Sequence, residues 1–166
     1  MCLSQFLQSL VPPLVGSFSG VFVAFLINSY ISRRKRKKQR KDLLLLLHAA
    51  LEKNKLRVEK LEEKLERGIY TPHYKIDVLP LESTVSLQYE LIDSFNLKKN
   101  LDTVRYELSH LNRKLDILVT TQNNEDYRIA VVDSTLALLR GNDEPSLSKR
   151  LEDTLTLINS ELGDNA

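Results

Sequence analysis

The chain of 166 residues contains a single cysteine, Cys2. One cysteine excludes an internal disulfide framework and a zinc site built on cysteine ligands. Cys2 also lacks the upstream lipobox that a bacterial lipoprotein carries. Reversible acylation is one use for such a residue, but we expect an inert side chain.

Charge is absent from the first 32 residues, because no Asp, Glu, Lys or Arg precedes Arg33. Acidic residues are also absent from residues 33–41, where eight of nine side chains are basic. The other 16 basic residues stand against 22 acidic ones, so residues 42–166 carry a net charge of −6. Phosphate contacts need a basic surface, so the sequence argues against a long nucleic acid as partner.

The uncharged part of the chain contains a segment typical of a membrane span. Residues 10–31 are 22 residues without a charge. At about 1.5 Å per residue, such a helix crosses a hydrocarbon core of roughly 30 Å. A cleaved signal peptide has basic residues before its apolar run, whereas here they follow it. We therefore expect an uncleaved transmembrane anchor over residues 1–32, with Pro12 and Pro13 at the start of its helix.

The basic block of residues 33–41 sets the orientation of this anchor, because positive residues stay on the cytoplasmic side of a span. The sequence predicts a single-pass protein of the inner (cell) membrane, with its N-terminus outside and residues 42–166 in the cytoplasm. Each basic side chain beside the anionic inner leaflet contributes about 1 kcal/mol. Nucleic-acid binding by the block is the alternative. The residues expected at the membrane surface are Arg33, Arg34, Lys35, Arg36, Lys37, Lys38, Arg40 and Lys41.

Small or polar residues recur every four positions in the expected span, at Gly16, Gly20, Ala24 and Asn28. This spacing places them on one face of a helix. Small residues let helices approach closely in lipid, and the Asn28 amide gains a partner there. The face predicts association of the spans into a homo-oligomer. The alternative is that glycine and other small residues are common in membrane helices for other reasons.

No proline or glycine occurs between Gly20 and Gly68, so one helix can run from the span to residue 67, with Gly68 as its C-cap. A polar residue, Asn54, interrupts a stripe of apolar residues in this helix. Asparagine at such a place is a register device of coiled coils, although three heptads also suit ordinary helix packing. The run from Leu43 to Leu47 is apolar all round, which predicts a turn buried on several sides. The stripe consists of Leu44, Leu47, Leu51, Val58, Leu61 and Leu65.

Residues 69–80 are the one long irregular stretch, bracketed by Pro72 and Pro80. A loop rich in aromatic and basic residues is a reasonable ligand site. The alternative is a connector whose Ile76, Val78 and Leu79 pack against the helices. The candidate ligand-binding residues are Tyr70, His73, Tyr74 and Lys75.

The rest of the chain alternates helical patterns with short breaks. We expect one helix over residues 81–94, a second capped by Asn123 or Asn124, and a last one with Asp143 or Glu144 near its N-cap and Pro145 in its first turn. The clearest pattern is gapless: Leu97, Leu101, Val104, Leu108, Leu111, Leu115 and Leu118. The predicted fold class is all-α: one N-terminal transmembrane helix continuing into a cytoplasmic bundle of about five helices.

Catalytic and metal-binding signals are lacking. His48, His73 and His110 show no metal-ligand spacing, and no phosphate-binding or nucleophile motif occurs. We expect no enzymatic activity, no cofactor and no metal. A polar cluster around residues 105, 106 and 112–114 could offer donors to a phosphate, with a solvated helix face as the alternative.

The order of span, basic block, long helix, proline loop and second leucine-rich helix resembles a class of small uncharacterised prokaryotic single-span membrane proteins. Their pattern is matched here by Leu47, Asn54, Val58 and Leu61. In layout, the chain is also similar to the membrane effectors of type III CRISPR antiviral systems. That resemblance implies a cytoplasmic domain that binds a cyclic oligoadenylate and acts through membrane helices.

Two functions follow as expectations. The first is a membrane-anchored, self-associating sensor or effector, whose helical domain receives a signal such as a small nucleotide. The alternative is a structural tether or adaptor that holds a helical interaction domain at the inner membrane.

Overall fold

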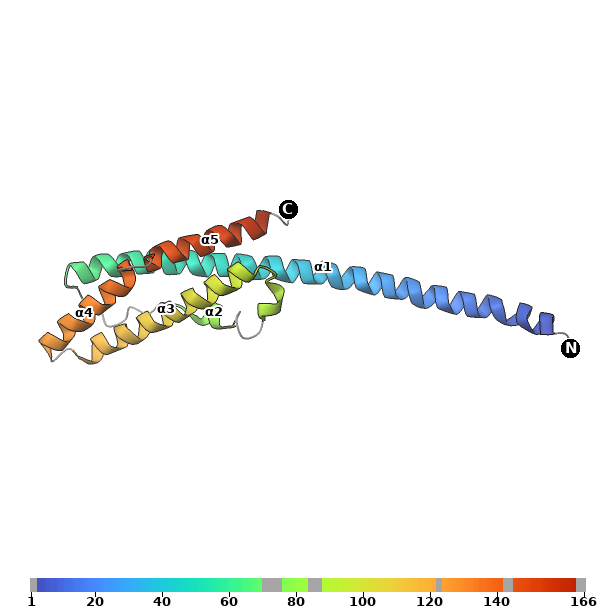
Figure 1. Cartoon of the computed structure of the whole chain (residues 1–166), viewed down its shortest axis with the longest axis horizontal. Helices are drawn as coiled ribbons and strands as arrows, with labels where there is room; N and C mark the ends of the chain where they lie inside the picture. The colour runs from blue at the N-terminus through green and yellow to red at the C-terminus, as the bar shows by residue number, and fades with distance from the viewer. Residues whose placement is uncertain (1–2, 70–75, 84–87, 122–123, 142–144, 164–166) are drawn as a thin grey trace. The chain divides into compact units, whose positions relative to one another are not determined.

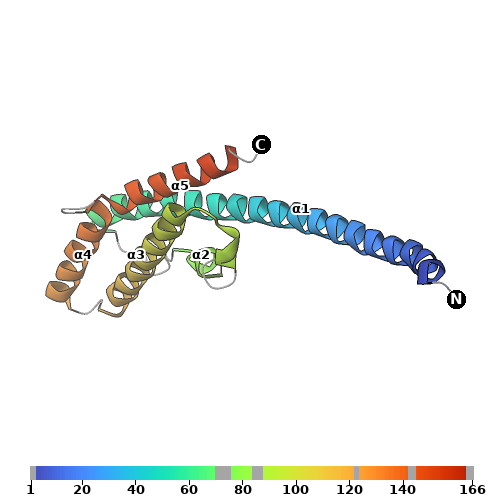
Figure 2. The same cartoon turned by 45° about the vertical axis from the view of Figure 1, so that its right-hand side comes forward.

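The computed structural model describes residues 3–69, 76–83, 88–121, 124–141 and 145–163, with side chains from residue 23 onward, Leu79 excepted. The described residues form helices and no strand (Figures 1 and 2), so the predicted all-α class is confirmed. They fall into two compact units, Met1–Gln39 and Arg40–Ala166. Among the described side chains, no helical stretch is long and apolar enough to cross a membrane.

The longest helix is α1, Leu3–Glu66, whose residues from Arg40 onward belong to the second unit. It begins before Pro12 and Pro13, so the prediction that these prolines mark a helix start is wrong. A proline inside a helix removes one backbone hydrogen bond, and here the helix continues through both.

The end of α1 is a Schellman turn. Gly68 has a φ of +69°, which an L-residue rarely adopts. Its N–H donates to the Leu65 carbonyl at 3.1 Å, and the Ile69 N–H donates to the Lys64 carbonyl at 2.9 Å. The predicted C-cap is therefore confirmed.

The predicted stripe of α1 forms one wall of the core. All six of its apolar residues are buried, and Asn54 between them is fully buried as well. Leu45 and Leu46, in contrast, are 50% and 54% exposed. The prediction that this turn is buried on several sides is wrong, because the bundle covers only one side of α1.

Three more long helices complete the bundle: α3, Phe95–Thr120, α4, Glu125–Arg140, and α5, Leu147–Gly163. α5 lies beside the second-unit part of α1 in both views, and α3 packs against α4 and α5 (Figures 1 and 2). The seven apolar positions predicted in α3 are all buried. At the end of α4, Arg140 pairs with Glu62 at 3.2 Å and with Glu66, which joins α4 to α1.

Each of these helices begins at a side-chain cap, where an oxygen accepts an otherwise unpaired backbone N–H. Ser94 caps α3 and Asn124 caps α4, both at 3.2 Å. α5 is capped by Ser146, which accepts from the Lys149 N–H at 3.2 Å. Asn124 is one of the two caps predicted. The predicted start of α5 is wrong, because Pro145 precedes the helix; Asp143 and Glu144 lie outside the described residues.

The single helix predicted over residues 81–94 is wrong. The structure has a short helix α2, Leu79–Ser83, and a 3₁₀ helix η2, Tyr89–Leu91. Ile92 is extended, with φ −94° and ψ 116°, and the chain then turns into the cap of α3. A buried Ile92 side chain fixes this turn.

Two asparagines hold the segment that enters α2. Asn54 of α1 donates its Nδ2 to the Asp77 carbonyl at 2.8 Å. Asn112 of α3 accepts from the Ile76 N–H and donates to the Ile76 carbonyl, both at 2.9 Å. The side chains of Ile76 and Val78 are buried, as the connector alternative expects. The buried Asn54 side chain thus binds a backbone carbonyl of the segment before α2.

Candidate functional site: a groove between α3 and α5

A groove of about 290 Å³ lies between α3 and α5, beside Pro145, which is two residues before α5. Its lining mixes charged, amide, hydroxyl and apolar groups, which suits a small polar ligand. The lining residues are Lys99, Asn100, Thr103 and Val104 from α3, Arg150, Asp153 and Thr154 from α5, and Pro145.

Helical hydrogen bonds set the hydroxyl chemistry of the groove. Thr103 donates to the Lys99 carbonyl at 3.0 Å, and buried Thr154 donates to the Arg150 carbonyl at 2.7 Å. Both hydroxyl protons are therefore committed to the backbone, and each oxygen keeps acceptor capacity. Ligand donors would come from the Lys99 ammonium and the Asn100 amide.

The arginine of the groove is already held in place. The Nε of Arg150 lies 3.2 Å from Oε1 of Glu107 and donates to the Pro145 carbonyl at 3.2 Å. Because both charged side chains of this pair are mostly buried, the guanidinium is fixed in position and its charge is largely balanced. Arg150 therefore contributes to the shape of the groove more than to its net charge.

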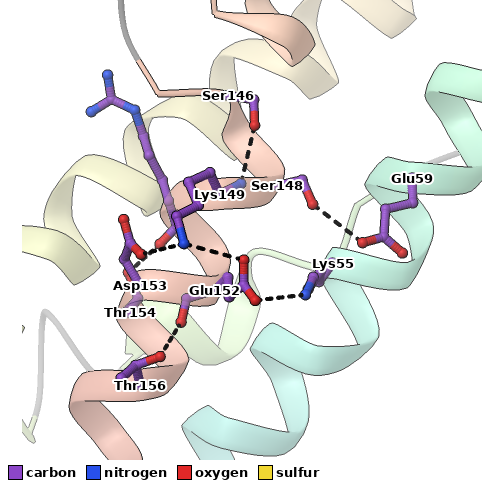
Figure 3. Close-up of polar contacts among 10 residues, drawn as sticks. Lys55, Glu59, Ser146, Ser148, Lys149, Glu152, Asp153, Thr154 and Thr156 are labelled. Carbon is purple, nitrogen blue, oxygen red and sulfur yellow. Dashed lines mark hydrogen bonds and ion pairs between the residues drawn. The ribbon is translucent and has the colours of Figure 1, made fainter.

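The outer edge of α5 is tied to α1 by a row of polar contacts (Figure 3). Ser148 donates to Glu59 at 3.2 Å, and Lys55 lies 3.9 Å from Glu152. Lys149 lies 3.2 Å from Asp153 and 3.5 Å from Glu152, and the hydrogen bond to Asp153 is the main cause that raises the pKa of Lys149. These contacts pair the charged side chains of this edge with one another.

The Lys99 ammonium makes no ion pair with any residue that the structure describes. Within the described ranges, the groove therefore offers the Lys99 ammonium without an ion pair, the Asn100 amide and the carboxylate of Asp153, which is paired with Lys149. That set can bind a small molecule through one anionic group and one donor. Within the described ranges, no three His, Cys, Asp or Glu side chains are placed to hold a metal ion.

No protein-family model matches the chain. No curated protein and no solved structure matches it either.

The predicted association face lies within α1. Gly16 and Gly20 belong to the stretch of the helix whose side chains lie outside the description, while Ala24 and Asn28 are exposed. Seven of the eight basic residues predicted at a membrane surface are exposed as well. Arg34 stacks its guanidinium 4.8 Å above the Tyr30 ring.

Arg40, the eighth basic residue, is only 20% exposed. Its Nη1 lies 2.8 Å from Oδ2 of Asp93, and its Nη2 pairs with Glu161 at the end of α5. The guanidinium therefore joins α1 to two later segments of the second unit. The membrane-surface role of this residue stays a prediction.

The predicted ligand-binding residues Tyr70, His73, Tyr74 and Lys75 lie outside the described residues. The polar cluster considered for phosphate does not converge on one point. Asn112 binds the connector, Lys114 donates to Ser134 at 2.8 Å, and Arg105 lies 3.6 Å from Asp102.

Sequence reasoning missed the α3–α5 groove. Its residues come from two helices about fifty positions apart, and each is an ordinary polar residue on a helix surface. A signal in α3 is Asn100, a polar residue at the edge of the buried stripe, with Thr103 and Lys99 further round the helix surface. The stripe predicts which face is buried, but it does not say which helix packs there.

Proposed function

We propose that the chain is a membrane-anchored, self-associating sensor or effector. The observation that carries this proposal is α1, in which the uncharged residues 10–31, the basic block and the first wall of the bundle follow one another in one helix, Leu3–Glu66. Residues 1–32 serve as the anchor and residues 42–166 as the receiving domain. The N-terminus lies outside the inner membrane and the receiving domain in the cytoplasm.

Anionic lipids of the inner leaflet are the first partner. Seven exposed basic residues follow the uncharged segment directly, and each contributes about 1 kcal/mol near such a surface. Alkaline carbonate extraction of cell membranes tests the anchor: the proposal expects the chain to stay with the membrane. Release into the supernatant would remove the basis of the proposal.

The signal in this proposal is a small anionic molecule, with a cyclic oligonucleotide in antiviral defence as its most concrete form. The α3–α5 groove supports it through the ammonium of Lys99, which makes no ion pair with a described residue, beside the Asn100 amide. Titration of the detergent-extracted chain with cyclic oligoadenylates should give binding that Lys99→Glu weakens at least tenfold. Lys98→Glu, the neighbouring residue outside the groove lining, is the matched control.

A tether or adaptor is the second candidate, and the charge balance of the groove favours it. Arg150 and Asp153 are both paired, so Lys99 is the main attraction for an anion. Replacing residues 1–32 by a neutral polyleucine span separates the two functions. A tether keeps its cellular effect with any span, whereas a sensor that acts through packed spans loses it.

A further inference from the structure

The second unit exposes a row of apolar side chains on α1, on the face opposite its buried stripe. Leu45 and Leu56 are 50% and 58% exposed, and Ala49 is exposed between them. At 100° per residue, Leu45, Ala49 and Leu56 lie within about 40° of one another and roughly opposite Asn54. Exposed apolar residues that gather on one helix face favour an interaction surface.

Charges of opposite sign border this row on its two sides. Glu52 and Lys53 are adjacent in sequence, and the same pair recurs seven residues later as Glu59 and Lys60. All four side chains are exposed. Counted along the helix, the two glutamates lie on one side of the row and the two lysines on the other, each roughly 50° from its centre.

Taken by themselves, these four charges are self-complementary in a parallel pair but not in an antiparallel one. In a parallel pair related by a two-fold axis, the acidic side of one helix faces the basic side of its copy. In an antiparallel pair, lysines face lysines and glutamates face glutamates. We propose that a second copy of this chain packs against this face in parallel, with Leu45, Ala49 and Leu56 meeting their own equivalents across the axis.

The existing contacts of these charges leave the pairing open. Glu52 lies 3.6 Å from His48, Lys53 lies 3.8 Å from Asp77, and Glu59 accepts a hydrogen bond from Ser148 at 3.2 Å. Exposed pairs at such distances contribute little and exchange readily. The inference rests on the proposed function for the self-association itself, and adds to it the partner, the orientation and a contact surface in the second unit.

Cysteine cross-linking of the full-length Cys2→Ser chain tests the orientation. Ala49→Cys and Leu56→Cys are made separately, and each is oxidised in membranes. A parallel pair cross-links both variants to themselves. An antiparallel pair brings at most one of them onto its copy, because the two positions are about 10 Å apart along the helix. Asp126→Cys, exposed on α4, is the control expected to stay monomeric.

Charge reversal tests the contact itself. Glu52→Lys should weaken dimerisation roughly three- to tenfold, because two Glu–Lys pairs per dimer become like-charge pairs. Adding Lys53→Glu exchanges the two sides and should restore the wild-type dimer. Circular dichroism of each variant confirms that the bundle is folded.

The outcomes separate the two proposals. Cross-linking of both cysteine variants supports the inference, whether or not carbonate releases the chain from the membrane. Release by carbonate contradicts only the proposed anchor. A folded, membrane-retained chain in which neither position cross-links and Glu52→Lys has no effect overturns the inference and leaves the anchor in place.

Discussion

Asn112 of α3 both accepts from the N–H and donates to the carbonyl of Ile76, each at 2.9 Å. One side chain thereby satisfies the two polar backbone groups of a residue whose own side chain is buried. Asn112→Ala should lower the free energy of unfolding by about 2 kcal/mol, because both backbone groups lose their partner. Chemical denaturation followed by circular dichroism measures this. Arg113→Ala, at the exposed neighbouring position, should stay within about 0.5 kcal/mol of the wild type.

Arg40 gives a second stability prediction. Arg40→Met keeps the aliphatic stem but removes the charge that faces Asp93 and mostly buried Glu161. We expect a loss of about 1–2 kcal/mol after allowing for partial exposure. The double variant with Glu161→Met should cost less than the sum of the two single changes. Additive costs would show that the pair is not coupled. Lys41→Met, at an exposed position, is the control.

The small-residue face of the expected span makes a prediction about assembly. Gly16→Leu or Gly20→Leu should abolish oligomers of the detergent-extracted chain and the cellular effect together, because a bulky side chain keeps the helices apart. Phe18→Leu lies on the opposite face of the helix and should leave the oligomer intact. Cross-linking followed by gel electrophoresis distinguishes the variants. Oligomeric, active Gly16→Leu protein would show that this face has no function.

The environment of Tyr89 should make the stability of the chain depend on pH on the alkaline side. The Tyr89 hydroxyl donates to Asp102 at 2.9 Å, and burial first, then this hydrogen bond, raises the pKa of Tyr89 above its ordinary value of 10.0. A raised pKa means that the neutral phenol is favoured in the folded chain. Its contribution is complete below about pH 10 and is lost as the pH rises through the folded-state pKa. Tyr89→Phe should therefore lose less stability than the wild type between pH 9 and 11 (roughly one unit on either side of the ordinary tyrosine pKa), as thermal melts would show.

Periodicity predicted most of the core. Leu101, Leu108 and the other residues of the α3 stripe are buried because burial repeats with the helical turn. The same rule overestimated Leu45 and Leu46, since an all-apolar turn has a buried face only where another helix covers it. A pattern in one helix does not reveal its neighbour.

Long-range polar contacts were beyond sequence reasoning. Arg40 and Glu161 are 121 residues apart, and their charges look like those of any exposed helix. Asn54 was predicted inside the stripe, and it is buried there. Its bond to the Asp77 carbonyl could not be predicted, because every residue offers a carbonyl. The side chains that line the groove share this difficulty.

The two asparagines that hold the connector have a consequence for how this segment can vary. Asn54 and Asn112 bind the main chain of Asp77 and Ile76, and a carbonyl or an N–H is the same for almost every amino acid. The Asp77 side chain is only partly buried, so substitution there costs little as long as the backbone keeps its course. Related sequences should therefore drift freely at position 77 while holding an amide at positions 54 and 112. In this segment, selection should therefore constrain Asn54 and Asn112 in the flanking helices more than the side chain of Asp77.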